Sequence, residues 1–343
     1  MNFALGDIVG NETLRARLNF AINDSTLSHA YILEGAKGSG RHTLALHTVA
    51  SMCCDDKGTD GKKIPCKRCL HCKKIFEGKT PDINLIGLEG DRASIGVDAV
   101  RFLKNDIYLP PTDLPLKVYI VEDAEKMTVQ AQNAFLLSLE EPPQYVIFFL
   151  ICETSSPLLE TIKSRAPVLR TEKISPSQIE DFLLSCDKRA IQMKESSPED
   201  FYELIYACDG SIGYALDLLD SKKRKSVFED RQIAKDFINL ALGKHSRDKF
   251  ELVFLLGTKR QDICERLFYV QYALRDLIAL KKSDDAPLCF YPDKEYACEL
   301  STHFTLKKLL TLYSATEIAI DDLSRNSNVR LTLINMLKNS DLI

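Results

Sequence analysis

The sequence predicts an α/β fold, a parallel sheet with helices on both faces, followed by a small helical domain and a larger all-α domain. Apolar runs such as Lys117–Val121 and Tyr145–Ile151 alternate with segments of helical periodicity. Strands that are apolar on both faces belong to parallel sheets covered from both sides. Beyond Ser175 and Pro176 the strand signals fade, and apolar residues recur at helical spacing. The fold class therefore changes once along the chain.

The composition is that of an ordinary folded protein and excludes several other classes. Of the 343 residues, 45% are apolar and 27% are charged, which suits two or three domains with cores of their own. No apolar run approaches the roughly 18 residues of a membrane span, and Met1–Gly10 lacks the pattern of a signal peptide. We therefore expect a cytoplasmic protein with no membrane partner. A net charge of −4 argues against a protein that coats nucleic acid through its overall charge.

The first domain, expected over residues 1–172, begins with an amphipathic helix. Leu14, Leu18 and Ile22 recur at four-residue steps, the spacing of one helical face. A later helix is delimited by Thr128, a residue type that caps helices, and by Pro142, which cannot continue one. In chain order we expect a helix over 11–22, a strand over 30–34, a helix over 44–52, a strand over 82–88, a helix over 97–107, a strand over 117–121, a helix over 129–139 and a strand over 145–151.

The remaining chain is predicted to be helical. Residues 173–222 are expected to form a small bundle with helices near 178–184, 198–208 and 213–219, and residues 223–343 a larger helical domain. The basic run Lys222–Lys225 between them is interpreted as a solvated linker or helix face, because charge runs usually are.

A glycine-rich loop connects the strand over 30–34 to the helix that follows it. The residues of interest are Gly35, Gly38, Gly40, Arg41, His42 and Thr43. Such a turn directs backbone N–H groups and the positive end of a helix at one anion, the geometry of nucleotide phosphate sites. A working phosphate loop has lysine and then Ser or Thr after its last glycine, whereas this chain has Arg41 and His42. The loop is a degenerate nucleotide site, and ATP is a doubtful ligand for it.

Cysteines cluster in one segment, at about residues 53–74, directly after the helix of the glycine loop. Cys66, Cys69 and Cys72 have the two-residue spacing with which a tight turn presents thiolates to one metal ion, and Cys54 completes a set of four. The sequence predicts a structural zinc site, with Cys53 as an alternative to Cys54. His71 is a weaker alternative ligand because it lies between two of the cysteines. A four-thiolate site has no open position for water, so no catalytic role is implied.

Two further motifs each admit two interpretations. Glu122 and Asp123 end an apolar strand, where a nucleotide hydrolase holds magnesium and polarises the attacking water, but a solvated strand end has the same residues. Arg165, in Ser164-Arg165 after the last strand, is either a surface charge or an arginine finger that stabilises phosphoryl charge on a neighbouring subunit.

Together these motifs resemble the bacterial DNA polymerase III clamp-loader family, and most closely its delta-prime branch. The resemblance covers the first 220 residues or so. The stretches that carry it are Ile8–Asn11, Ser28–Tyr31, the glycine loop, the cysteine segment, Pro81-Asp82, Gly96–Arg101, the acidic strand end, Ala134–Pro143, Ser164-Arg165 and Gly210–Leu216. Leu139-Glu140-Glu141-Pro142-Pro143 and the cysteine segment are the most specific of them.

The resemblance implies an AAA+ module, a helical lid and a collar domain that joins a hetero-pentamer. The implied partners are tau/gamma-type motor subunits, a delta-type subunit, the sliding clamp indirectly, and primer-template DNA, all within the polymerase III holoenzyme. In this family the Ser-Arg arginine acts in trans on ATP held by the adjacent motor subunit, which assigns that role to Arg165. The family's next residue is cysteine, whereas this chain has Ala166.

Several departures from the family pattern indicate slow or absent ATP hydrolysis. Arg41 and His42 replace the lysine and the magnesium hydroxyl, and the acidic pair is inverted to Glu-Asp. The lid arginine of motor subunits aligns with Gly213, and the polar sensor residue falls near Cys152 or Glu153. These losses leave no magnesium-centred mechanism. We therefore expect a non-hydrolysing, stator-like subunit that binds ATP weakly or not at all.

Two other functions remain as alternatives. One is an active ATPase subunit of the tau/gamma type, which Arg41, His42 and Gly213 disfavour. The other is a zinc-containing DNA-binding protein, in which the basic residues of the cysteine segment contact phosphates. Those residues are Lys62, Lys63, Lys67, Arg68, Lys73 and Lys74.

Overall fold

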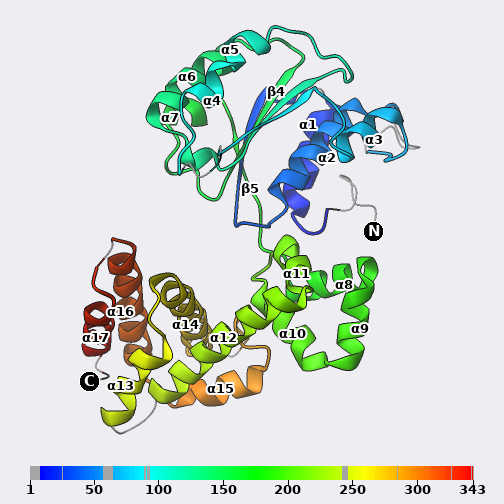
Figure 1. Cartoon of the computed structure of the whole chain (residues 1–343). Helices are drawn as coiled ribbons and strands as arrows, with labels where there is room; N and C mark the ends of the chain where they lie inside the picture. Colours follow the sequence, from blue (N-terminus) through cyan, green and yellow to red (C-terminus); the bar gives the residue numbers. More distant parts are fainter. Residues whose placement is uncertain are drawn as a thin grey trace. The chain divides into compact units, whose positions relative to one another are not determined.

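The computed structural model describes residues 8–24, 26–56, 65–88, 90, 93–241, 246–283, 285–325, 327–340 and 342 (Figure 1). The chain divides into two compact units. The first comprises residues 1–178 with 211–213, and the second comprises 179–210 with 214–343. The boundaries 1–172, 173–222 and 223–343 remain predictions.

The first unit contains a five-stranded sheet in the order β2-β3-β4-β1-β5. Every neighbouring pair of strands is parallel, which confirms the predicted sheet class. The short strand β5 was not predicted, because three residues with one buried side chain, Leu169, give too little apolar signal. The strands are β1 (Ala30–Glu34), β2 (Ile83–Ile86), β3 (Lys117–Val121), β4 (Val146–Cys152) and β5 (Val168–Arg170).

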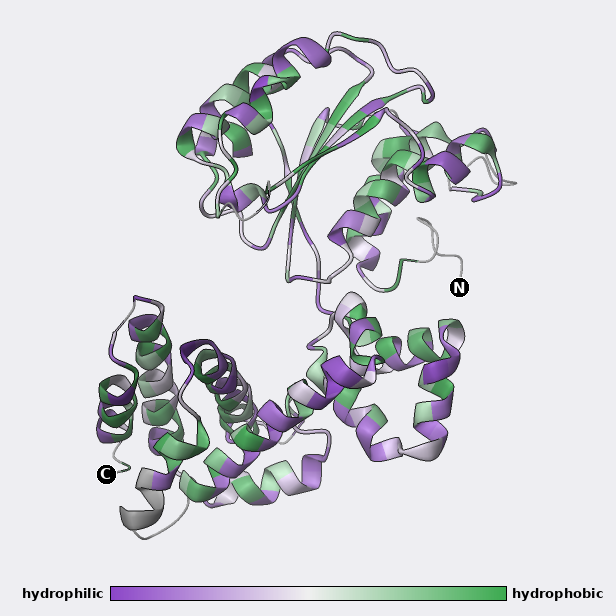
Figure 2. Ribbon diagram, in the orientation of Figure 1, coloured by the Kyte–Doolittle hydropathy of each residue, from purple (hydrophilic) through white to green (hydrophobic). Residues whose placement is uncertain are grey.

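Helices pack on both faces of this sheet, because successive side chains of a strand point to opposite faces. Tyr31, Leu33 and Phe149 belong to one apolar cluster, which includes α1, α2 and α3. Ile32 and Phe148 belong to the other, which includes α4 to α7 (Figures 1 and 2). The helices are α1 (Glu12–Asn23), α2 (Arg41–Cys53), α3 (Leu70–Phe76), α4 (Asp98–Arg101), α5 (Leu103–Asp106), α6 (Val129–Glu140) and α7 (Glu160–Lys163), with the 3-10 turn η1 (Ala124–Lys126).

Most predicted elements of this unit are confirmed within a few residues. The hydroxyl of Thr128 accepts the Ala131 N–H at 3.2 Å and caps α6 as predicted. The helix predicted over 97–107 is wrong in its continuity, since α4 and α5 are separate at Phe102. There the Phe102 carbonyl accepts from both Asn105 and Asp106, the pattern of a tightened turn.

The Pro81-Asp82 motif has a structural role in the same unit. The buried carboxylate of Asp82 accepts backbone N–H groups of Thr112, Asp113 and Leu114 at 2.6 to 2.8 Å. It therefore joins the start of β2 to the loop before β3. A carboxylate at this place satisfies three otherwise unpaired backbone donors.

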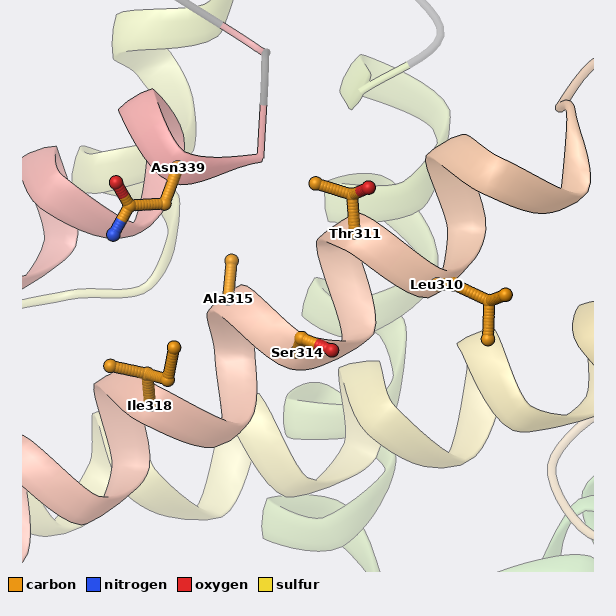
Figure 3. A pocket seen from close by; sticks show the side chains of 6 residues that line it. All are labelled: Leu310, Thr311, Ser314, Ala315, Ile318 and Asn339. Carbon is orange, nitrogen blue, oxygen red and sulfur yellow. The ribbon is translucent and has the colours of Figure 1, made fainter.

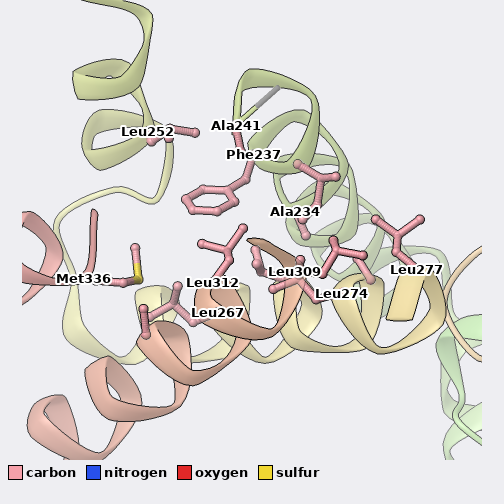
Figure 4. Packing of buried hydrophobic residues seen from close by; sticks show 14 of the residues in the cluster. Ala234, Phe237, Ala241, Leu252, Leu267, Leu274, Leu277, Leu309, Leu312 and Met336 are labelled. Carbon is pink, nitrogen blue, oxygen red and sulfur yellow. The ribbon is translucent and has the colours of Figure 1, made fainter. Parts of the chain in front are cut away.

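The rest of the chain is helical, as predicted, and its largest core lies among α12 to α17 (Figure 4). Phe237, Leu267 and Leu312 are fully buried there. No helix in the described part of the chain is both long and apolar enough to cross a membrane. The helices are α8 (Pro176–Cys186), α9 (Lys188–Ser196), α10 (Pro198–Ala207), α11 (Ile212–Leu218), α12 (Ser221–Ala241), α13 (Ser246–Leu255), α14 (Arg260–Leu280), α15 (Lys294–Thr302), α16 (Leu306–Ser324) and α17 (Val329–Asn339).

A buried ion pair joins α10 to α12 in the second unit. The Arg231 guanidinium, 2% exposed, donates to the Glu203 carboxylate at 2.7 Å and to the Phe290 carbonyl at 2.6 Å. The guanidinium carbon of Arg231 (Cζ) lies 4.3 Å from the centre of the Phe290 ring, a cation–π distance. Lys235 adds a second cation, 3.0 Å from Glu203. This network holds the first helices of the unit on its larger core.

Candidate functional site

The glycine loop lies at the carboxyl edge of the sheet. It leaves β1, which pairs with β4 on one side and β5 on the other. The Gly35 N–H donates to the Cys152 carbonyl at 3.1 Å, so the loop starts as an extension of the sheet. Gly38 and Gly40 have φ of 76° and 82°, values that favour glycine. The backbone of a phosphate loop is therefore retained.

Other residues of the same chain fix this loop in place. The Ser39 and Thr171 hydroxyls are 2.9 Å apart, and the Thr171 N–H donates to the Glu34 carbonyl at 2.8 Å. A Cβ at Gly35 would lie 1.8 Å from the Thr171 hydroxyl oxygen. Thr171, which follows β5, therefore occupies the space that a side chain at position 35 would need.

Replacing Gly35 by alanine should lower the free energy of unfolding by about 1–3 kcal/mol, the usual cost of overpacking a tight contact. Gly96→Ala is the matched control, because its added Cβ meets nothing within 4 Å. Urea denaturation followed by circular dichroism measures both variants. Equal midpoints for Gly35→Ala and Gly96→Ala would contradict the contact with Thr171.

Arg41 and His42 begin α2 at the place where a phosphate loop presents lysine and a magnesium ligand. Arg41 is buried, with 8% of its surface exposed. The His42 Nε2 lies 3.7 Å from the Glu122 Oε1. An imidazole thus faces the carboxylate that would otherwise help to hold the metal ion.

The second acid and the sensor position are also engaged elsewhere. Asp123 has a left-handed backbone, φ 50°, and its Oδ2 lies 2.8 Å from the Lys126 Nζ. Cys152 is fully buried, and burial together with nearby carboxylates raises the pKa of its thiol to about 12. The Glu153 N–H donates to Glu125 at 3.1 Å. At the sensor position, Cys152 therefore offers a buried thiol and Glu153 a carboxylate, and neither is equivalent to the hydroxyl of a threonine sensor.

Gly213 belongs to the first unit and lies directly against the glycine loop. Its N–H donates to the Gly38 carbonyl at 3.2 Å. A Cβ at Gly213 would be 3.2 Å from that oxygen and 3.3 Å from the Gly38 Cα. The contact distance therefore leaves little room for the arginine that motor subunits carry here.

Arg165 lies in the turn after α7, and its guanidinium is partly exposed. Nη1 donates to the Thr161 carbonyl at 3.1 Å, and Nη2 lies 3.3 Å from a carboxylate oxygen of Glu140. The side chain is 36% exposed. Ala166, the departure from the family's cysteine, is fully buried in the cluster under α6 and α7. A small apolar residue fits that position and leaves the guanidinium at the surface.

The cysteine segment brings four sulfur atoms together. The Sγ atoms of Cys54, Cys66, Cys69 and Cys72 lie within 4.8 Å of one another. Tetrahedral zinc with bonds of about 2.3 Å needs sulfur separations of about 3.8 Å, so a small contraction would suffice. Backbone N–H groups of Cys66, Cys69 and Cys72 point at the sulfurs of Cys54, Cys66 and Cys69 at 3.3 to 3.4 Å.

These N–H groups suit thiolate ligands. Burial raises the pKa of Cys66, but the N–H groups of Arg68 and Cys69 outweigh it, and the pKa falls to about 7. Cys53 is the last residue of α2 and lies outside the set, with its pKa raised to about 12, chiefly by burial. His71 is also engaged, since its Nδ1 lies 2.9 Å from the Cys53 carbonyl and 3.1 Å from Asp55. The open choice between Cys53 and Cys54 thus goes to Cys54.

Metal analysis of protein purified without added metal should give about one zinc ion per chain, since four thiolates bind zinc tightly. Cys54→Ser should lose that ion, while Cys53→Ser should keep it. Inductively coupled plasma mass spectrometry measures both. Loss of zinc in Cys53→Ser with retention in Cys54→Ser would reverse the assignment.

The second unit carries an open groove on α16, closed at one side by Asn339 at the end of α17 (Figure 3). Leu310 and Ile318, which line it, are 47% and 53% exposed. The other lining residues, Thr311, Ser314 and Ala315, carry no charge. The lining thus combines the apolar Leu310, Ala315 and Ile318 with the uncharged polar Thr311, Ser314 and Asn339.

Three residues that shape the site were not predicted: Thr171, Glu34 and Glu140. Thr171 contacts Ser39 of the loop and is itself bonded to the Glu34 carbonyl, while Glu140 contacts Arg165. Glu140 belongs to the Leu-Glu-Glu-Pro-Pro stretch noted in the sequence, which was the available signal. The contact itself joins residues 25 apart, so no local pattern could reveal it.

An interior parallel strand, a glycine loop and a helix, with acids ending a nearby strand, define an α/β protein of the phosphate-loop class. Residues 10–175 match the family model described as "DNA polymerase III, delta subunit". Together with the relatives below, this match confirms, over residues 10–175, the resemblance to the bacterial DNA polymerase III clamp-loader family.

Three relatives illustrate the match. The chain is 35% identical to DNA polymerase III subunit delta' of Bacillus subtilis over 167 residues, 49% of each protein. It is 32% identical to subunit tau of B. subtilis over 216 residues, 62% of this chain and 37% of tau. It is also 32% identical to subunit gamma of Buchnera aphidicola over 218 residues, 62% of this chain and 57% of gamma. The chain thus spans between about a third and three fifths of these relatives.

Solved structures of clamp-loader-related proteins align over most of the chain, but with low TM-scores. A DNA polymerase III gamma subunit-related protein of Thermotoga maritima covers 94% of this chain and 98% of its own, with 17% identity and a TM-score of 0.43. The B. subtilis DNA clamp loader delta protein covers 95% and 99%, with 12% identity and a TM-score of 0.35. Scores of this size do not define a shared arrangement.

Proposed function

We propose that this chain is a non-hydrolysing, stator-like subunit of the DNA polymerase III clamp loader, of the delta-prime type. In this proposal the first domain is an AAA+ module whose own nucleotide site is degenerate. Arg165 acts in trans on ATP held by a tau/gamma-type motor subunit. A delta-type subunit completes the hetero-pentamer, which places the sliding clamp on primer-template DNA.

The observation that carries the proposal is the state of the glycine loop. His42 stands against Glu122 at 3.7 Å, where a motor subunit would hold magnesium. Gly213 contacts Gly38, where such a subunit would direct an arginine at the γ-phosphate. Both replacements remove positive charge or a metal from the point at which negative charge develops during phosphoryl transfer. The loop is preserved as a turn, and its chemistry is lost.

The exposed Arg165 supports the second half of the proposal. A chain that cannot hydrolyse ATP has no use of its own for an arginine finger. Its guanidinium is fixed at the surface by Thr161 and Glu140, where a neighbouring subunit could meet it. Arginine suits this role because its planar fork matches phosphoryl oxygens.

The second unit fits the oligomerisation role expected of residues 223–343. The uncharged groove on α16 leaves Leu310 and Ile318 exposed, as a surface that contacts other subunits would. The zinc module, in this proposal, stabilises its own loop and takes no part in catalysis.

The alternatives have less support. The tau and gamma relatives favour an active motor subunit by name, but Arg41, His42 and Gly213 disfavour it. For DNA binding through the zinc module, Arg68 and Lys74 already pair with Asp56 and Asp113 at 2.5 and 2.7 Å. Lys62 and Lys63 lie outside the described residues.

Equilibrium dialysis of the isolated chain against labelled Mg·ATP should detect no binding in the micromolar range. The physical reason is that the backbone amides of the loop remain, but the lysine, the metal ligand and the lid arginine do not. A tau/gamma-type motor chain serves as the positive control. Micromolar affinity, or release of labelled phosphate by the isolated chain, would overturn the non-hydrolysing assignment.

A further inference from the structure

Glu140 is the last residue of α6 and the only described acidic side chain that contacts Arg165 in the structure. Its Oε1 lies 3.3 Å from Nη2 of the guanidinium. The Thr161 carbonyl accepts a hydrogen bond from Arg165 Nη1 at 3.1 Å. A guanidinium has five N–H donors, so three remain for another acceptor. The contacts with Thr161 and Glu140 hold the guanidinium through Nη1 and Nη2 and leave its other N–H donors for a further acceptor.

The backbone beneath Arg165 is already rigid. Gln132 of α6, 2% exposed, accepts the Leu159 N–H at 2.8 Å and donates to the carbonyls of Met127 and Pro157. These bonds fix the start of α7 on α6. The Arg165 N–H donates to the Ile162 carbonyl at 3.0 Å, and Ile162 is fully buried. The position of the Arg165 side chain therefore depends on what holds the guanidinium itself.

We propose that Glu140 is a positioning residue for Arg165: it holds the guanidinium in the orientation in which its free donors meet the phosphoryl group on the neighbouring subunit. This inference rests on the proposed function of Arg165. A long side chain held in place before the partner binds loses less freedom in the transition state. Glu140 touches no substrate and acts through Arg165 alone.

The test is steady-state ATP hydrolysis on primed DNA by the complex reconstituted from this chain and tau/gamma-type motor chains in which the arginine of their own Ser-Arg motif is replaced by alanine, so that only the site facing this chain contributes. Glu140→Gln removes the charge and keeps the shape. It should lower kcat about 3- to 10-fold, as expected for loss of an exposed ion pair that orients a reacting group, with KM for ATP within twofold. Glu141→Gln is the matched control, since it makes the same change one residue away and should leave both constants unchanged.

A double variant separates positioning from a general structural effect. With Arg165→Ala already present, Glu140→Gln should cause no further loss, because its effect passes through the guanidinium. Thermal melting checks that each variant is folded. The inference would be overturned if Glu140→Gln had a kcat equal to or higher than that of the wild type. It would also be overturned if Glu140→Gln caused the same loss of kcat with and without Arg165. If Arg165→Ala itself has no effect, the proposed function fails as well, so the two failures are distinguishable.

Discussion

Arg165→Ala should reduce ATP hydrolysis at the adjacent motor site by about a thousandfold or more. Arginine fingers contribute about 10³ to 10⁵ in kcat by stabilising charge on the phosphoryl oxygens. The guanidinium is 36% exposed and has donors to spare, so it is available to a neighbour without rearrangement of the backbone. The effect should appear in kcat, because the finger acts on the transition state and not on bound ATP.

The other motor sites must be silenced to see this effect. Motor chains in which the arginine of their own Ser-Arg motif is replaced by alanine leave Arg165 as the one finger in the complex. Single-turnover hydrolysis with those chains measures the site that faces this subunit. Arg170→Ala is a suitable control, since Arg170 is a surface residue of β5 that pairs with Glu34 within the chain. Equal rates for Arg165→Ala and the wild type would contradict the assignment of Arg165 as an arginine finger.

Arg231→Met should destabilise the second unit by about 3 kcal/mol. Removing one partner of a buried ion pair costs about 3–5 kcal/mol, and the lower end applies because Lys235 remains beside Glu203. The substitution also removes the donor to the Phe290 carbonyl. Urea denaturation measures the change. Arg189→Met is the control, because Arg189 pairs with Asp187 at the surface, and its midpoint should match that of the wild type.

The pH dependence gives a second signature of the same network. Burial raises the pKa of Glu203, but the charges of Arg231 and Lys235 outweigh it, and the pKa lies below its ordinary value. A carboxyl whose pKa is lower in the folded state stabilises the fold above its unfolded pKa. That stabilisation is lost as pH falls toward the folded pKa. The wild type should therefore lose more stability than Arg231→Met between neutral and acidic pH, and parallel curves would contradict this.

The sheet could be predicted because its signal is local. The continuous apolar runs of β3 and β4 are buried on both faces, and the capping residue Thr128 sets the start of α6. The missed elements carry weak signals. In α9 only Ala190 and Met193 are buried, so the pattern resembles a polar loop. The helix predicted over 97–107 divides at Phe102 through a local hydrogen-bonding choice that side-chain spacing does not encode.

The site was predictable in its residue types but not in its contacts. Adjacent Cys53 and Cys54 are indistinguishable by spacing. The fold separates them because α2 ends at Cys53, which stays buried, while extended backbone at Cys54 turns its sulfur toward the other three. The pairs Gly35 with Thr171 and Arg165 with Glu140 join distant segments. Long-range contacts of this kind arise from the packing of the sheet.

The most direct test of the account compares two variants in one measurement, DNA-stimulated ATP hydrolysis by the reconstituted complex. Arg41→Ala alters the chain's own loop, and Arg165→Ala alters the group proposed for its neighbour's site. With Arg165 as the one finger in the complex, we predict that Arg41→Ala retains the wild-type rate and that Arg165→Ala loses at least 99% of it. Loss of hydrolysis in Arg41→Ala with full activity in Arg165→Ala would contradict the account, since the chain would then be a motor itself.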